Sequence, residues 1–151
     1  MVYQAANIQP PEPVFMDYVL EEQAGFLLRQ VNQRHTVIFA ELMPDGLTPT
    51  QFSAMVKLYE IGPCSQNHLG RLTAMDAATI KGVISRLRER GFARTTPDET
   101  DKRRLLVTLT PEGEAAIETA LPRAREITER TLAPLSPGER NTFLSLLKKL
   151  R

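Results

Sequence analysis

Two adjoining stretches of the sequence decide the fold: DAATIKGVISRLRERGF at residues 76–92 and ARTTPDETDKRRLLVTLT at residues 93–110. In the first, apolar residues recur at the spacing of a helix with one buried face, namely Ile80, Val83, Ile84 and Leu87. The β-prone runs at residues 92–95 and 105–109 lie on either side of a polar segment. Together the two stretches predict a helix followed by a β-hairpin with a long, charged tip.

The surrounding chain supplies start and stop signals for further helices. Asp76 is a typical N-cap residue, and Gly91 suits the left-handed position that follows a helix. Upstream, Thr48-Pro49-Thr50-Gln51 has the pattern of a capping box and opens a helix over residues 49–61. A short helix over residues 65–72 and a brief turn complete a helix-turn-helix. The hairpin makes this unit a winged helix-turn-helix.

Longer helices are expected on both sides of this unit. A proline-free amphipathic stretch predicts a helix from about residue 15 to residue 43, ended by Pro44 and Gly46. Thr110-Pro111-Glu112 opens another helix, to about residue 132, which we expect Pro122 to kink or break. Ser136-Pro137-Gly138-Glu139 is a second capping box and opens a final helix. The predicted fold class is therefore mainly α with a small β-hairpin wing (α+β).

Composition excludes several classes of protein. The 151 residues, of which 42% are hydrophobic, suffice for a core without disulfides or structural metals. The lone cysteine, Cys64, cannot form an internal disulfide, which indicates a reducing cytoplasm. We expect neither a membrane span nor a signal peptide. With two histidines, one cysteine, no glycine-rich phosphate loop and no metal-ligand cluster, we expect no enzyme activity, catalytic residue, metal or cofactor.

The net charge of +1 is unevenly distributed. Between residues 71 and 104, nine Lys and Arg residues accompany five Asp and Glu residues, so this segment carries +4 and the remainder −3. A basic patch on a slightly acidic body is typical of a polyanion-binding protein. The outward side of the predicted helix over residues 77–90 is small or basic, and therefore suits the major groove of duplex DNA. The hairpin tip, Asp101-Lys102-Arg103-Arg104, suits the minor groove, with Asp101 orienting an arginine.

Three motifs carry a resemblance to a known family: Leu69-Gly70-Arg71-Leu72, SRLRERGF at residues 85–92, and DKRR at residues 101–104 leading into LTPEG at residues 109–113. With the helix order, they make the chain similar to the MarR family of bacterial regulators. The resemblance implies a homodimer with interlocked terminal helices on a palindromic DNA site. It also implies that Arg103 is the minor-groove residue and Asp101 its orienting partner. The recognition helix starts Asp76-Ala77-Ala78, where relatives often place a serine and a longer polar residue.

The motifs and the resemblance together assign the DNA contacts and the domains. The expected DNA-binding residues are Ser65, Gln66, Ala77, Ala78, Thr79, Lys81, Gly82, Ser85, Arg86, Asp101, Lys102, Arg103 and Arg104. We expect a flexible arm at residues 1–13, a winged helix-turn-helix DNA-binding lobe at residues 47–110, and a helical dimerisation lobe at residues 14–46 and 111–151. Apolar residues of that lobe favour a homodimer because one small lobe cannot cover them: Leu121, Ile127, Leu132, Leu135, Phe143, Leu146 and Leu147.

The resemblance also implies an effector, since such relatives often bind small phenolic or hydroxylated heteroaromatic acids between the two lobes. Arg29 could bind a carboxylate through two hydrogen bonds, and His35 could donate to a ring oxygen. Tyr18 and Tyr59 are further candidates for lining this site. The alternative is that Arg29 and Arg34 form surface ion pairs while His35 is an interface residue.

Two other functions remain open from the sequence. A winged helix can serve protein contacts alone, in which case DNA affinity would depend little on salt. Redox sensing through Cys64 is the second, as in the peroxide-sensing branch of the MarR family. That branch uses a cysteine near its first helix, whereas Cys64 precedes the short helix, which favours an inert residue.

Overall fold

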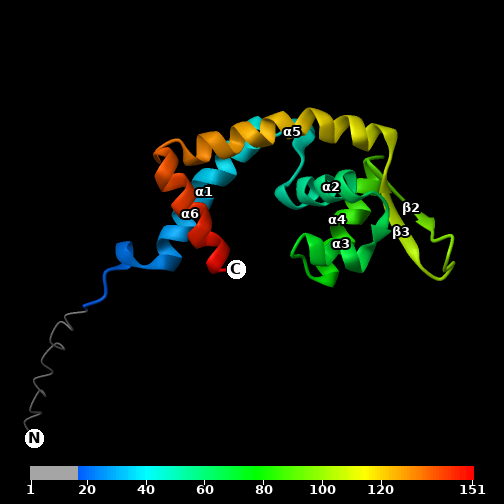
Figure 1. The fold of residues 1–151 in the computed structure, drawn as a ribbon, viewed down its shortest axis with the longest axis horizontal. Coiled ribbons are helices and arrows are strands. Elements are labelled where there is room, and N and C mark those ends of the chain that lie inside the picture. The colour runs from blue at the N-terminus through cyan, green and yellow to red at the C-terminus, as the bar shows by residue number, and fades with distance from the viewer. Residues whose placement is uncertain (1–16) are drawn as a thin grey trace, which may run out of the picture.

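The computed structural model describes residues 17–151, and the predicted arm at residues 1–13 lies outside them (Figure 1). The described chain contains six α-helices, two 3₁₀ turns and three short strands. In chain order the helices are α1 Ala24–Leu42, α2 Pro49–Ile61, α3 Gln66–Leu72, α4 Ala77–Glu89, α5 Pro111–Leu132 and α6 Pro137–Lys149. The strands are β1 Cys64–Ser65, β2 Ala93–Pro97 and β3 Leu105–Leu109. The prediction of a mainly helical winged helix-turn-helix is confirmed.

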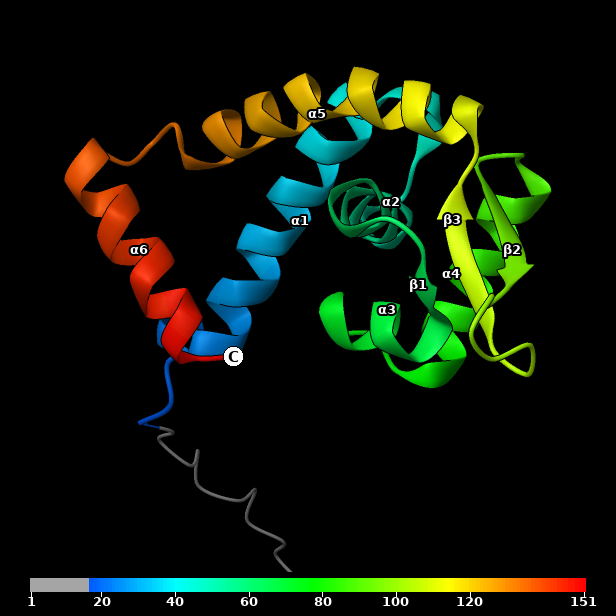
Figure 2. The same cartoon turned by 45° about the vertical axis from the view of Figure 1, so that its right-hand side comes forward.

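Helix α5 joins two parts of the molecule. Helices α2, α3 and α4 and the small sheet lie together beneath one end of α5, whereas α1 and α6 lie beneath its other end (Figure 2). The first part of α5 contacts α2 and β3, and α5 also packs along α1. No helix among residues 17–151 is long and apolar enough to cross a membrane.

The helix starts follow the predicted caps. Thr48 and Ser136 each form a complete capping box, at α2 and α6 respectively. The side chain of Asp76 accepts a hydrogen bond from the Thr79 amide at 2.7 Å and caps α4. Gly91 has a φ of +74°, the left-handed conformation expected after this helix.

The sheet has the order β1-β3-β2, and both pairings are antiparallel. Strands β2 and β3 form the predicted hairpin, with Thr95 opposite Val107. Strand β1 was not predicted because two residues give no recognisable alternation. It adds to the other edge of β3, with Cys64 opposite Val107, and so ties the start of α3 to the wing.

The structure contradicts the predicted start of α1 and the break that was one of the two outcomes expected at Pro122. Helix α1 begins at Ala24 rather than near residue 15, because Gln23 has an extended backbone that separates α1 from a 3₁₀ turn at Leu20–Glu22. Pro122 neither ends nor divides α5, which is one helix from residue 111 to residue 132. Pro122 lies on the exposed side of α5, where water can solvate the helix carbonyl left without its amide partner.

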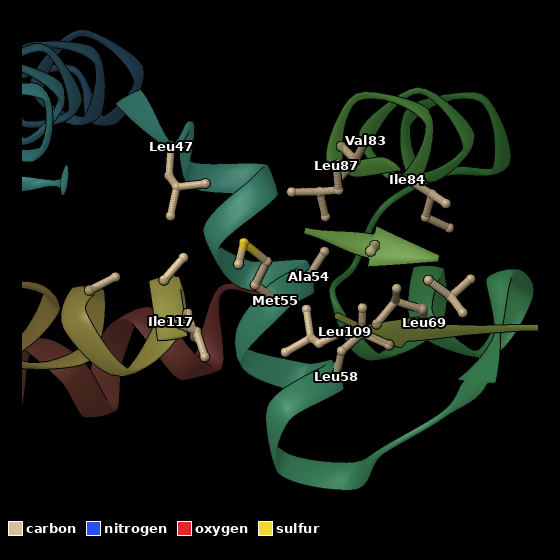
Figure 3. Packing of buried hydrophobic residues seen from close by; sticks show 14 of the residues in the cluster. Leu47, Ala54, Met55, Leu58, Leu69, Val83, Ile84, Leu87, Leu109 and Ile117 are labelled. Carbon is tan, nitrogen blue, oxygen red and sulfur yellow. The ribbon is translucent and has the colours of Figure 1, made fainter. Parts of the chain in front are cut away.

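The core lies between α2, α4, the sheet and α5 (Figure 3). Its largest fully buried side chains are Met55, Leu69, Ile80, Leu87, Val107 and Ile117. Ile117 belongs to α5, so the long helix is part of the same core as the winged helix-turn-helix. Burial of each such side chain stabilises the fold by roughly 1.5–3 kcal/mol.

Candidate DNA interface and effector cavity

Helix α4 presents two chemically different faces. Its buried face consists of Ile80, Val83, Ile84 and Leu87. The predicted contact residues on the other side are exposed, namely Ala77, Ala78, Thr79, Lys81, Ser85 and Arg86. Gly82 lies among them, and a Cβ atom there would have no neighbour within 4 Å, so nothing in the chain blocks close approach along this side. The exposed face is therefore narrow and carries hydroxyl and cationic donors.

The N-terminus of α4 is held by its cap. The backbone hydrogen bond from Thr79 keeps the pKa of Asp76 below its usual value of 3.8. A charged carboxylate at this position satisfies an amide that would otherwise lack a partner and interacts favourably with the helix dipole. The first turn, which carries Ala77, Ala78 and Thr79, is thereby ordered before any ligand arrives.

The wing and the start of α3 enclose one groove. Its walls include four of the predicted contact residues: Ser65, Gln66, Arg103 and Arg104. Arg104 Nη2 donates to Ser65 Oγ at 3.4 Å, which links the hairpin to the N-cap of α3. Asn67 and Arg71 also line the groove and add further polar and cationic groups.

The hairpin tip is built differently from the prediction for Asp101. Asp101 Oδ1 accepts a hydrogen bond from the backbone amide of Arg103 at 3.1 Å, and no ion pair with the Arg103 guanidinium is found in the described chain. A short carboxylate side chain reaches the amide two residues ahead more readily than the end of a long arginine. Asp98 makes a similar turn through Thr100, whose backbone hydrogen bond lowers the pKa of Asp98. The turn is fixed while the Arg103 guanidinium keeps its donors available.

A second candidate site lies between α1, α5 and α6. It is a mainly apolar cavity of about 310 Å³ lined by Leu28, Val31, Asn32, His35, Thr128, Thr131, Leu132, Phe143, Leu144 and Leu147. Its volume is at the lower end of the range for small-molecule sites, which begins at about 300 Å³. His35 is half-buried, and its Nδ1 lies 2.9 Å from Thr131 Oγ1.

The structure places the other predicted effector residues elsewhere. The Arg29 guanidinium carbon lies 5.2 Å from the ring centroid of Phe26, and Arg29 is exposed. Tyr18 is 58% exposed. Tyr59 donates its hydroxyl to Glu118 on α5 at 2.9 Å, a hydrogen bond that raises the pKa of Tyr59. None of the three is among the residues that line the cavity beside His35.

Arg34 and Arg130 have partners that the sequence did not indicate. Arg34 donates to the backbone carbonyls of Thr131 and Arg130, at 2.5 and 2.7 Å, instead of pairing with a surface carboxylate. Arg130 instead forms the ion pair with Glu41, with 3.3 Å between Nη2 of Arg130 and Oε2 of Glu41. No local pattern could reveal this pairing, because about a hundred residues separate its members along the chain.

Cys64 and the remaining titratable groups form no reactive cluster in residues 17–151. Cys64 is buried against β3, and this burial raises the pKa of its thiol. No group of three or more His, Cys, Asp or Glu side chains comes together there to hold a metal ion. The described residues thus offer an exposed helix face beside a cationic groove, and a small apolar cavity.

Comparisons with known proteins agree with this arrangement. The sequence profile of the MarR family matches residues 47–105. The chain is 42% identical over 134 residues to the HTH-type transcriptional repressor NicR of Pseudomonas putida, covering 88% of this chain and 85% of NicR.

Solved structures extend the match to the helices at both ends. A probable transcriptional regulator from Pseudomonas aeruginosa is 55% identical, with a TM-score of 0.86 over 88% of this chain and 100% of that chain. BpsR of Bordetella bronchiseptica, whose DNA binding is regulated by 6-hydroxynicotinic acid, is 42% identical, with a TM-score of 0.83 over 88% of this chain and 96% of that chain. Fold, exposed recognition helix and sequence relatives therefore agree, and the chain belongs to the MarR family of DNA-binding transcriptional regulators.

Proposed function

We propose that this chain is a repressor that binds a palindromic operator as a homodimer and is released from it by a small aromatic acid. The observation that carries the effector assignment is the apolar cavity with the half-buried His35 on its wall. The 42% identity to BpsR, whose DNA binding responds to 6-hydroxynicotinic acid, makes that acid the first effector to test.

We assign the DNA contacts to residues 47–110, the winged helix-turn-helix DNA-binding lobe. Helix α4 enters the major groove, where Lys81 and Ser85 contact bases and Arg86 contacts a phosphate. Arg103 enters the minor groove from the wing, where a narrow A·T-rich segment concentrates negative potential. The exposed face of α4 and the hairpin turn held by Asp101 support this docking.

For the dimer, residues 14–46 and 111–151 supply the interface. Helix α6 contains no buried residue, although its apolar side chains include Leu146, which is 51% exposed, and Leu150, which is 77% exposed. Leu27, Leu28 and Val31 of α1 are likewise about half exposed, at 46–50%. Two members of the predicted interface, Ile127 and Leu132, are already buried within the chain. Apolar surface of this extent on neighbouring helices favours association with a second copy.

For the effector, the mainly apolar cavity walls suit an aromatic ring, and His35 supplies a polar contact. Asn32 and Thr128 offer two more polar groups. Because Arg29, Tyr18 and Tyr59 lie outside the cavity, we propose that they contact the effector only if the second copy brings them to it.

Calorimetric titration with 6-hydroxynicotinic acid tests the effector assignment. We expect saturable binding to the wild-type protein and binding weaker by at least about tenfold in His35→Ala, since a polar contact in an apolar site is lost. His68→Ala, on α3 and away from the cavity, should change the affinity by less than about twofold. Absence of binding to the wild type, or equal binding by the two variants, would overturn the assignment. Sedimentation velocity tests the dimer, and a monomer at micromolar concentration would refute it.

A further inference from the structure

Two adjacent residues of α1 hold the same residue of α5. Arg34 donates to the backbone carbonyl of Thr131, and His35 Nδ1 lies 2.9 Å from the hydroxyl oxygen of that threonine. Arg34 also donates a hydrogen bond to the backbone carbonyl of Arg130, at 2.7 Å. Both the backbone and the side chain of Thr131 are therefore fixed relative to the imidazole, on the wall of the cavity.

The hydroxyl of Thr131 has a side-chain partner on another helix, unlike the helical threonines that bond back to their own helix. Within α1, α5 and α6, three threonines donate to the carbonyl four residues earlier, at 2.8–3.1 Å: Thr36, Thr119 and Thr142. Thr131 makes no such bond, and its recorded side-chain partner is His35 Nδ1. A hydroxyl can donate one proton or accept one, so the direction of this hydrogen bond follows from the tautomer of His35.

We propose that Thr131 is a positioning residue for the effector site. Its hydroxyl donates to Nδ1 of His35 and thereby places the imidazole proton on Nε2. The Nε2–H group then donates to an acceptor oxygen of the effector. This inference rests on the proposed effector cavity and deepens it, because it assigns the hydrogen-bonding role that the effector must fill.

The fixed tautomer restricts the class of ligand. A partly buried N–H donor left without an acceptor is unfavourable, so a ligand that offers only apolar atoms or donors at this point binds less tightly. A carboxylate oxygen or a ring oxygen that accepts a hydrogen bond satisfies it. The cavity therefore selects acids and oxo-aromatics over amines and plain hydrocarbons of the same size.

Nitrogen NMR of histidine-labelled protein tests the tautomer without any ligand. The chain has two histidines, so His68→Gln assigns the His35 signals directly. At about pH 8.5 an ordinary imidazole is neutral. We expect the proton on Nε2 in the wild type, a mixture of tautomers in Thr131→Val, and the wild-type pattern again in Thr131→Ser.

Thr128→Val is the matched control, because Thr128 lines the same cavity from the same helix and has no hydrogen bond to His35. It should leave the His35 signals unchanged. A wild-type proton on Nδ1, or a Thr131→Val spectrum identical to that of the wild type, would overturn the inference.

The affinity for 6-hydroxynicotinic acid gives the second readout. We expect Thr131→Val to weaken binding by about tenfold, equivalent to the 1.36 kcal/mol of one well-placed hydrogen bond. Thr119→Val, on the same helix but outside the cavity lining, should change it by less than about twofold. In a His35→Ala background, Thr131→Val should have no further effect, because the threonine acts through the histidine.

These outcomes separate the inference from the proposed function. Binding by the wild type that Thr131→Val leaves unchanged would refute the positioning role and keep the effector site. Failure of the wild type to bind the acid would refute the effector assignment, while the NMR tautomer would still decide whether Thr131 orients His35.

Discussion

Gly113, in the first turn of α5, lies directly against the backbone carbonyl of Phe92, which follows α4. A Cβ atom at residue 113 would lie 2.0 Å from the Phe92 oxygen. The same oxygen accepts the amide of Thr110, whose hydroxyl in turn accepts the amide of Gly113. The end of the recognition helix and the start of α5 are thus locked together.

Gly113→Ala should destabilise the protein by about 3 kcal/mol, because neither backbone segment can move away from the added methyl group without breaking these hydrogen bonds. Chemical denaturation measures the effect. Gly138→Ala is the matched control, since a Cβ there meets nothing within 4 Å and α6 gains a better helix former. A decrease in the free energy of unfolding below about 1 kcal/mol in Gly113→Ala would show that the backbone at this junction can shift to accommodate the methyl group.

Arg103→Ala should weaken DNA binding across all sequences by about tenfold and reduce the slope of log affinity against log salt by about one unit. Its guanidinium has no ion pair in the described chain, so the loss comes from the DNA contact rather than from the fold. Anisotropy titrations at three salt concentrations measure both quantities. Unchanged affinity at matched salt would refute the wing contact and favour the protein-interaction alternative.

Lys81→Ala should instead alter sequence preference. A side chain that contacts a base edge discriminates by about 1–3 kcal/mol at one position, and its loss relaxes the preference there. Competition by single-base operator variants measures the change. A uniform loss on every duplex would reassign Lys81 to a phosphate.

Acid should weaken the cap of α4. The folded-state pKa of Asp76 is lowered, so its carboxylate stabilises the fold above the usual pKa of 3.8. This contribution is lost as the pH falls through the folded value. Wild-type melting temperature should therefore drop more steeply below about pH 4 than that of Asp76→Asn, since asparagine caps at every pH. Thermal melts of both proteins across this range measure the difference. Parallel acid profiles would exclude Asp76 as a source of the drop.

Oxidants should leave DNA binding unchanged. Burial raises the pKa of the Cys64 thiol, and the protonated form reacts slowly. We expect hydrogen peroxide to change operator affinity by less than about twofold in both the wild type and Cys64→Ala. A loss restored by dithiothreitol, and absent in Cys64→Ala, would instead establish redox control.

The elements with strong local signals could be predicted from the sequence. The caps at Thr48, Asp76 and Ser136 set three helix starts correctly, because capping depends on residues three apart. The start of α1 could not be predicted, since its amphipathic pattern continues through the extended Gln23. Strand β1 forms only by pairing with β3, and no local pattern contains that partner.

The candidate sites were predictable to different degrees. The exposed face of α4 follows from helical periodicity alone, so the structure places those residues together as expected. The effector cavity depends on tertiary contacts. The sequence identified His35 as an effector residue, but it did not indicate the contacts of Thr131 with His35 and Arg34. The carboxylate of Asp101 accepts a hydrogen bond from the backbone amide of Arg103, because the aspartate side chain is short. The pattern of charges along the sequence cannot reveal this contact.

The most direct test of a ligand-controlled repressor is fluorescence anisotropy on labelled DNA from upstream of the chain's own gene. The titration is run at several salt concentrations, with and without 6-hydroxynicotinic acid. We predict binding at least about 10³-fold tighter than to a scrambled duplex, weakened by salt and reversed by the acid. Binding no tighter than to the scrambled duplex, or specific binding that the acid leaves intact, would contradict the account.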